Sequence, residues 1–290
     1  MALHAIETAV DGRADAFLTQ IAEDLSRGPL NLPCFPDIVP RVRQALNDPR
    51  STPDDIVRIA GAEPRLAARL LQTVNSSVFN PTGKPLTNLR HAVTRLGHHL
   101  VQSVTMVFAI QQMKADSSLR PVAAPLRDLW EKSVAVGSLC QLLANQLKVP
   151  PDKVFLTGLL HGIGHFYIMV RAADPALGIA YSELPPALLA ERHPAMGRAI
   201  LQKWNFEPVV CEAIARQNDH GRESARAADI TDVVIASVLL AEVLLDADED
   251  LSRCAGVSAF NRLGLGGREL AATLKHTRHS LESLRGALGC

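Results

Sequence analysis

Aromatic residues and net charge are what this sequence has least of. Phe, Trp and Tyr together make up 4% of the 290 residues, and 30 basic residues are balanced by 30 acidic ones. A base-stacking platform for nucleic acid needs aromatic side chains, and general attraction to nucleic acid or to an anionic membrane needs an excess of positive charge. The composition therefore predicts neither a nucleic-acid partner nor a membrane partner.

Cysteine is also scarce and poorly placed for a structural role. The five cysteines are odd in number, and no two of them form a CxxC pair, which disfavours a disulfide framework and a zinc ribbon. The N-terminus lacks the apolar segment of a secretory signal. Together these features predict a reducing, cytoplasmic location.

No apolar run is long enough to cross a bilayer. The longest extends from Val233 to Leu245 and contains Glu242, whereas a membrane-spanning helix needs ~20 residues. We expect this run to form a buried helix.

Alternation of apolar and polar residues, which would indicate β-strands, is missing over any useful length. Apolar residues instead recur at helical spacing, and Pro and Gly separate the segments. Thr52 and Pro53, for example, predict a helix start, and Gly97 is expected to separate a helix over 85–96 from one over 98–113. The sequence therefore predicts an all-α protein.

The best candidate for a joint between two helical lobes is the segment 114–126, which contains two prolines and two adjacent serines. We therefore expect four parts. They are an N-terminal helical lead-in at 1–29, a first helical lobe at 30–117, a second helical lobe at 118–245 and a C-terminal helical extension at 246–290.

Two histidines stand four residues apart in the stretch Gly158-Leu-Leu-His-Gly-Ile-Gly-His165. If this stretch is one helix, both imidazoles lie on one face, within reach of one metal ion or one anion. His161 and His165 are therefore candidate ligands. The glycines Gly158, Gly162 and Gly164 predict that the backbone packs closely against its neighbours here.

Short motifs in a fixed order carry a family resemblance. In the first lobe they are Leu32-Pro33-Cys34-Phe35-Pro36, then Glu63-Pro64-Arg65-Leu66 with Asn75-Ser76 after it, then Ala92-Val93-Thr94-Arg95-Leu96-Gly97. In the second they are Leu129-Trp130-Glu131-Lys132-Ser133, the stretch from Phe155 to His161, Glu191-Arg192-His193 and Glu212-Ala213-Ile214. Over most of its length the chain resembles the HDOD domain, a bacterial signalling module related to the HD phosphohydrolases. The resemblance implies a two-lobed all-α fold whose second lobe is HD-like.

The HD phosphohydrolases hold metal ions with His and Asp side chains, and the metal activates a water molecule. The resemblance implies that two ligand histidines are kept as His161 and His193. The other ligand positions are filled by Lys132, Gly162, Gln217, Asn218 and Ser237. The resulting vestigial pocket comprises Lys132, His161, Gly162, His165, His193, Gln217, Asn218 and Ser237. No carboxylate remains at these positions and an ammonium group repels a cation, so we predict no metal, no cofactor and no catalytic residue.

The resemblance implies a non-catalytic regulatory or adaptor module of bacterial signalling that acts by contact with a signalling protein. Two alternatives stay open. One is a sensor that binds a nucleotide or another phosphate-bearing ligand in the pocket, with Lys132 and Arg192 replacing the charge of the metal. The other is a residual metal-dependent phosphohydrolase.

Several of the same residues also have a purely structural interpretation. Asn75 is expected to bond to backbone groups where a helix ends. Trp130 and Trp204 are expected to anchor the core of the second lobe. His161 itself is expected to hydrogen-bond inside that core.

Overall fold

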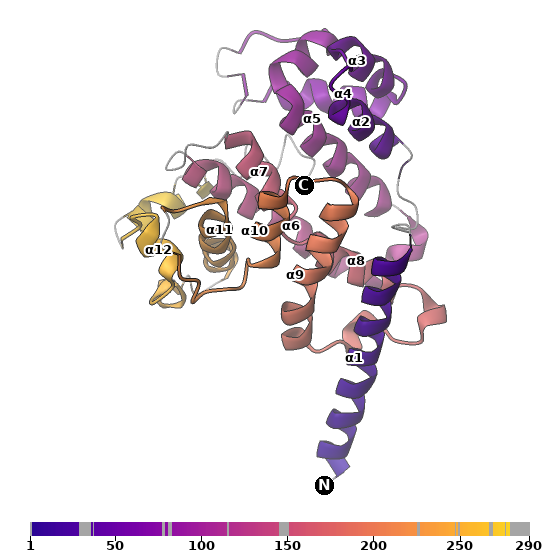
Figure 1. Ribbon diagram of the computed structural model, residues 1–290, viewed down its shortest axis with the longest axis vertical. Coiled ribbons are helices and arrows are strands. Elements are labelled where there is room, and N and C mark those ends of the chain that lie inside the picture. The colour runs from indigo at the N-terminus through magenta and orange to yellow at the C-terminus, as the bar shows by residue number, and fades with distance from the viewer. Residues whose placement is uncertain are drawn as a thin grey trace.

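The computed structural model describes residues 2–28, 36, 38–76, 79–80, 83–114, 116–144, 151–224, 227–246, 248, 250–266, 269–275 and 277–278. Within these residues every regular element is a helix, which confirms the predicted all-α fold class (Figure 1). The motif residues 32–35 and the end of the chain, 279–290, lie outside the described part.

The α-helices are α1 (Ala2–Arg27), α2 (Ile38–Asn47), α3 (Pro53–Gly61), α4 (Pro64–Val74), α5 (Leu89–Lys114), α6 (Ala123–Leu143), α7 (Pro151–Leu159), α8 (Ile163–Ala172), α9 (Pro186–Lys203), α10 (Pro208–Ala215), α11 (Ile230–Leu245) and α12 (Ser258–Arg262). Short 3-10 helices are η1 (Ser117–Val122), η3 (Pro175–Leu177), η4 (Tyr181–Glu183) and η5 (Leu251–Cys254). Figure 1 shows α2 to α5 gathered at one end and α6 to α11 at the other. The residue boundaries of the four predicted parts remain a prediction.

The first group of helices follows the local signals in its sequence. α3 begins at Pro53, directly after Thr52, as predicted. The Asp55 carboxylate accepts hydrogen bonds from the backbone N–H of Thr52 at 3.0 Å and from its hydroxyl at 2.8 Å, which closes the first turn. α5 is broken at Gly97, whose φ of 71° and ψ of 176° suit a residue without a Cβ. The two helices predicted on either side of Gly97 therefore form one interrupted element.

Asn75 explains why α5 begins at Leu89 and not at the predicted residue 85. Its side-chain nitrogen donates to the backbone oxygens of Leu71 at 2.9 Å and Leu86 at 2.7 Å. Its side-chain oxygen accepts from the backbone N–H of Leu86 at 2.7 Å. These bonds hold the non-helical segment before α5 against the end of α4 and confirm the structural interpretation of Asn75.

α11 lies at the centre of the second group. It packs against α6, α7 and α10, and the apolar run within it is mostly buried, as predicted. Trp130 on α6 and Trp204 at the end of α9 are only 3% and 6% exposed, which confirms their role as core anchors.

One stretch, Lys153–Ala172, has the length and hydropathy of a membrane-spanning helix. It is interrupted by a turn at 160–162 between α7 and α8. It is also 89% buried inside the protein, so its apolar side chains are taken up by core packing.

The N-terminal lead-in is a helix, as predicted, and it packs on the second group. α1 contacts α8 and α9, as Figure 1 also shows. Asp15 pairs with Arg192 of α9 at 2.7 Å, and Asp24 pairs with Arg171 of α8 at 2.9 Å. Two ion pairs therefore join α1 to the second group.

A buried carboxylate connects α11 to the segment after α10 and to α12. Asp232 has no exposed surface, and its two oxygens accept from Arg222 Nη1 at 2.7 Å, from Arg262 Nε at 3.1 Å and Nη2 at 2.9 Å, and from the backbone N–H of Asp229 at 2.9 Å. Burial opposes ionisation of this carboxyl group. The hydrogen bonds from Arg262, Asp229 and Arg222 outweigh burial and keep the pKa of Asp232 below its ordinary value. The ionised carboxylate thus ties the start of the C-terminal extension to the core.

Glycines let the helices of the second group approach one another closely. A Cβ atom on Gly164 of α8 would lie 1.9 Å from the backbone oxygen of His193 and 2.6 Å from the backbone nitrogen of Gly197, both on α9. A Cβ on Gly158 would lie 2.6 Å from Cys140 Sγ, and one on Gly162 would meet a leucine side chain of α6 at 2.7 Å. The close packing predicted from these glycines is confirmed.

Gly164→Ala should lower the free energy of unfolding by about 1–3 kcal/mol or more, because the added methyl group meets rigid backbone and forces α8 and α9 apart. The measurement is urea or thermal unfolding followed by circular dichroism. Gly12→Ala is the matched control, since it also lies in a helix, α1, but has nothing within 4 Å of an added Cβ. It should be neutral or stabilising by up to ~1 kcal/mol. Equal stability of the two variants would contradict the close helix contact.

Candidate functional site

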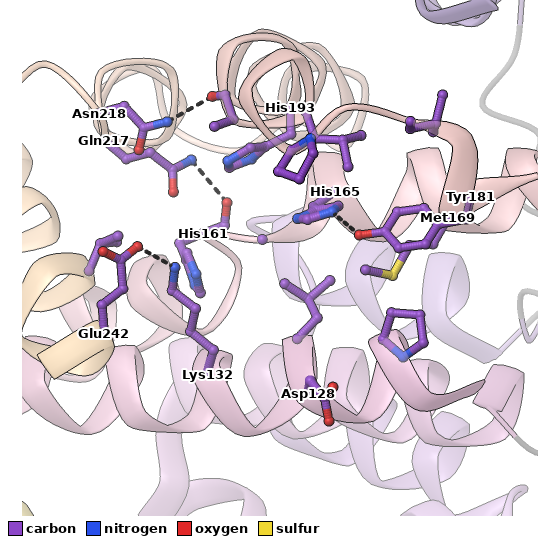
Figure 2. A pocket seen from close by; sticks show the side chains of 18 of the residues that line it. Asp128, Lys132, His161, His165, Met169, Tyr181, His193, Gln217, Asn218 and Glu242 are labelled. Carbon is purple, nitrogen blue, oxygen red and sulfur yellow. Dashed lines mark hydrogen bonds and ion pairs between the residues drawn. The ribbon is translucent and has the colours of Figure 1, made fainter. Parts of the chain in front are cut away.

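A cavity of about 650 Å³ opens in the second group of helices (Figure 2). Its wall includes every residue of the predicted pocket except one: Lys132, His161, Gly162, His165, His193, Gln217 and Asn218. Apolar side chains complete the wall, among them Leu129, Met169, Leu184, Leu189, Val238 and Leu245. Pockets that bind small molecules have volumes of about 300–1,000 Å³ and a mostly apolar lining with a few polar groups, and this cavity has both properties.

Ser237 is the predicted pocket residue that does not line the cavity. It is fully buried in α11. Val238, Glu242 and Leu245 are the α11 residues in the wall, and their spacing of four and then three residues places them on one face of the helix. Ser237 lies about 100° around the axis from Val238 and therefore faces away from the cavity.

Two carboxylates that the sequence analysis missed, Asp128 and Glu242, line the cavity. Lys132 Nζ lies 2.7 Å from Glu242 Oε1, and the two side chains are 29% and 30% exposed. The other oxygen of Glu242 accepts from Arg253 at 2.9 Å. A signal for Glu242 did exist, because it is the one charged residue within the apolar run of α11.

Arg192 does not join Lys132 at the cavity, contrary to the interpretation of the two as joint phosphate ligands. It is absent from the cavity wall and pairs with Asp15 at 2.7 Å. Both cations proposed from the sequence are therefore paired with a carboxylate, Lys132 inside the cavity and Arg192 outside it.

The prediction that His161 and His165 share one helical face is wrong. His161 lies in the turn between α7 and α8, and His165 lies in the first turn of α8. His161 Nδ1 donates to the backbone oxygen of Gly158 at 2.9 Å, which confirms the expected hydrogen bond inside the core. His165 Nε2 bonds to the Tyr181 hydroxyl at 2.7 Å, and its ring stacks on His193 with 5.5 Å between centroids.

The three imidazoles are uncharged at neutral pH. Burial lowers the pKa of His161 to about 3 and that of His165 to about 4, and the positive charge of Lys132 lowers both further. Burial and the neighbouring histidines hold the pKa of His193 well below its ordinary value. Lys132 and Glu242 compensate each other, so the cavity has no excess of positive charge.

Gln217 and Asn218 use their side-chain amides to fix the backbone around the cavity. Gln217 Nε2 donates to the backbone oxygens of His161 at 3.0 Å and Ile214 at 2.9 Å. Asn218 Nδ2 donates to the backbone oxygen of Ala190 at 2.8 Å. Figure 2 shows both amides beside the histidines.

The HDOD domain profile matches residues 32–220 of the sequence. The chain belongs to the HDOD domain family. No match was found among curated proteins.

Solved structures of other proteins share the HDOD fold. A "putative metal-dependent phosphohydrolase" from Shewanella amazonensis has 23% identity and a TM-score of 0.73 over 96% of this chain and 99% of that one. An HDOD domain protein of unknown function from Geobacter sulfurreducens has 20% identity and a TM-score of 0.61 over 94% and 97%. A "putative signal transduction protein" from Marinobacter aquaeolei has 20% identity and a TM-score of 0.60 over 97% and 66%. At these identities the likeness shows the fold.

The donor set of this HDOD cavity does not fit a metal ion of the HD phosphohydrolase type. Such a site needs several ligands that converge on one point. In the part of the chain that the structure describes, no group of three or more His, Cys, Asp or Glu side chains is placed to hold a metal. The Glu242 carboxylate is bonded to Lys132 and Arg253, and Nδ1 of His161 is bonded to backbone.

Acid should destabilise this HDOD protein through His161. The unfolded chain protonates this imidazole below its ordinary pKa of about 6.5, whereas in the folded chain the pKa is about 3. Stability from the neutral imidazole is therefore present above pH 6.5 and lost as the pH falls from 6.5 toward the folded pKa, by up to ~1.4 kcal/mol per pH unit. His161→Asn keeps a donor for Gly158, and it should remove about 2 kcal/mol of the loss between pH 7 and pH 5.

The measurement is denaturant unfolding of both proteins at several pH values. His91→Asn is the control, because His91 is exposed on α5 and its replacement should leave the pH dependence as in the wild type. Parallel curves for His161→Asn and the wild type would show that His161 is not held neutral by folding.

Proposed function

We propose that this HDOD chain is a non-catalytic regulatory module of bacterial signal transduction that acts by contact with a partner protein. The observation that carries the proposal is the Lys132–Glu242 ion pair, 2.7 Å long, inside the cavity. The resemblance to HD phosphohydrolases places a metal-ligand histidine at position 132. Here that position holds an ammonium group, which is bonded to the nearest carboxylate.

Electrostatics supports the absence of hydrolase activity. A dication near Lys132 would be repelled by its ammonium group, and it would compete with that group and with Arg253 for Glu242. The residues at 162, 217 and 218 are Gly, Gln and Asn, which offer no charged oxygen. A metal-bound hydroxide, the nucleophile of a metal-dependent phosphohydrolase, therefore has no complete ligand set here.

Family membership supports the signalling role. The HDOD family match and the likeness to the Marinobacter aquaeolei signal transduction protein both fit it. The name of the Shewanella amazonensis protein concerns that protein, and at 23% identity it does not assign a hydrolase activity to this one. The proposal includes a protein partner in the cytoplasm and no nucleic-acid or membrane partner.

A ligand sensor is the second candidate function. The specific observation in its favour is the cavity of about 650 Å³, which has the size of a small-molecule site. The phosphate-bearing ligand suggested by the sequence would have to displace Glu242 from Lys132, and Arg192 would not help. Sensing of a phosphate compound is thus less well supported than sensing of an uncharged one.

The purified chain should hydrolyse neither bis(p-nitrophenyl) phosphate nor nucleotides nor cyclic dinucleotides with Mn²⁺ or Mg²⁺ added, because the ligand set for the metal is incomplete. Product release is followed by absorbance and chromatography, and bound metal by plasma mass spectrometry, where less than stoichiometric metal is expected. Turnover that disappears in His161→Ala but persists in the exposed-residue control His91→Ala would overturn the non-catalytic assignment.

Contact with a partner is tested by affinity capture from the source bacterium, followed by reconstitution. A protein captured by the chain should bind it with fixed stoichiometry when both are purified, as measured by calorimetry or light scattering. The same partner should be bound by His161→Ala, since a contact mechanism does not require cavity chemistry. If no captured protein binds after purification, the contact mechanism is wrong.

A further inference from the structure

The floor of the cavity contains polar atoms that the fold leaves without partners. Gln217 is 1% exposed, and among the described residues its Oε1 has no hydrogen-bond donor. His193 Nδ1 is buried and lacks a partner in the same sense. A buried polar atom without a partner costs about 1–3 kcal/mol, and such atoms in folded proteins often mark a functional site or a bound molecule.

His161 adds a second acceptor to the floor. The backbone oxygen of Gly158 can only accept, so the proton of the neutral imidazole is on Nδ1, 2.9 Å away. The lone pair of His161 is therefore on Nε2. No partner for Nε2 is found in the described part of the chain, and His161 lines the cavity.

Lys132 supplies donors to the same space. An ammonium group has three hydrogens, and one of them is directed to Glu242 at 2.7 Å. Figure 2 shows Lys132, His161 and Gln217 on one side of the cavity. The floor thus offers two acceptors, Gln217 Oε1 and His161 Nε2, beside a donor whose charge Glu242 already balances.

Charge decides which class of ligand this floor favours. An anion would find three neutral imidazoles and one lysine paired with an acid. It would also face the carboxylates of Asp128 and Glu242 in the wall. A phosphate or carboxylate oxygen cannot donate to Gln217 Oε1 or His161 Nε2, so it would leave both acceptors unsatisfied.

We infer that the cavity binds an uncharged small molecule with a carboxamide or lactam group. The N–H groups of that molecule donate to Gln217 Oε1 and His161 Nε2, and its carbonyl oxygen accepts from Lys132 Nζ. Its apolar body packs on Leu129, Leu189 and Val238. The inference deepens the second candidate function and rests on it, and it is independent of the contact mechanism.

The test is calorimetry or saturation-transfer NMR with benzamide as a carboxamide probe and 2-pyridone as a lactam probe. Benzoate and phenyl phosphate have similar apolar bodies and serve as charged counterparts. At least one neutral probe should bind saturably, and the charged probes should bind at least about 10-fold more weakly, since a site built around unpaired polar groups discriminates strongly against a ligand that leaves them unpaired. Which of the two neutral probes binds more tightly separates a carboxamide ligand from a lactam ligand.

Two variants locate the binding. Ala190→Trp places a large side chain at an exposed position of the cavity wall, and Ala187→Trp places the same side chain at an exposed position of α9 outside it. Ala190→Trp should abolish binding, and Ala187→Trp should leave it unchanged. Gln217→Leu removes the unpaired acceptor and should weaken binding of the neutral probe about 10-fold, with circular dichroism to show that the variant is folded.

Three outcomes would overturn the inference: no saturable binding of either neutral probe, binding that survives Ala190→Trp, or tighter binding of benzoate or phenyl phosphate than of the neutral probes. None of them bears on the hydrolysis assay or on partner capture. A failure of this inference is therefore distinguishable from a failure of the proposed regulatory role.

Discussion

The cavity of this HDOD protein depends on the backbone contact between α8 and α9. Gly164 leaves no room for a Cβ against the backbone of His193 and Gly197, so the two helices touch where ordinary side chains would separate them. This contact brings the rings of His165 and His193 to 5.5 Å. It also surrounds the imidazoles with protein, and burial is the main reason that they are neutral.

Charge balance in the cavity is local and extends toward the C-terminal part of the chain. Glu242 accepts from Lys132 inside the cavity and from Arg253 of η5. Asp232, ten residues earlier on α11, holds Arg262 of α12 through a buried ion pair. The same helix that lines the cavity therefore carries the bonds that attach η5 and α12, and a change in the position of α11 would be felt in both places.

Sequence reasoning recovers what local chemistry determines. Helical periodicity, the start at Pro53, the break at Gly97 and the close packing at Gly158, Gly162 and Gly164 depend on residues near one another in the chain. Lys132 and Glu242 are 110 positions apart, and their pairing depends on the packing of α6 against α11. The same holds for Arg192, which turns to α1, and for Ser237, whose orientation depends on the rotation of α11. His161 was misplaced because no proline marks the turn that ends α7.

The replacement of metal ligands alters the chemistry of this cavity without removing its capacity to bind. In a metal site, lone pairs converge on a cation that satisfies them together. Here Gln217 stands at such a position, and its nitrogen is used to hold the His161 and Ile214 backbone, while its oxygen stays unbonded in the described structure. The imidazole of His161 is held in one tautomer by Gly158 and likewise keeps a lone pair. The convergent lone pairs thus persist without the carboxylates that would attract a dication, and neutral hydrogen-bond donors are the groups that match them.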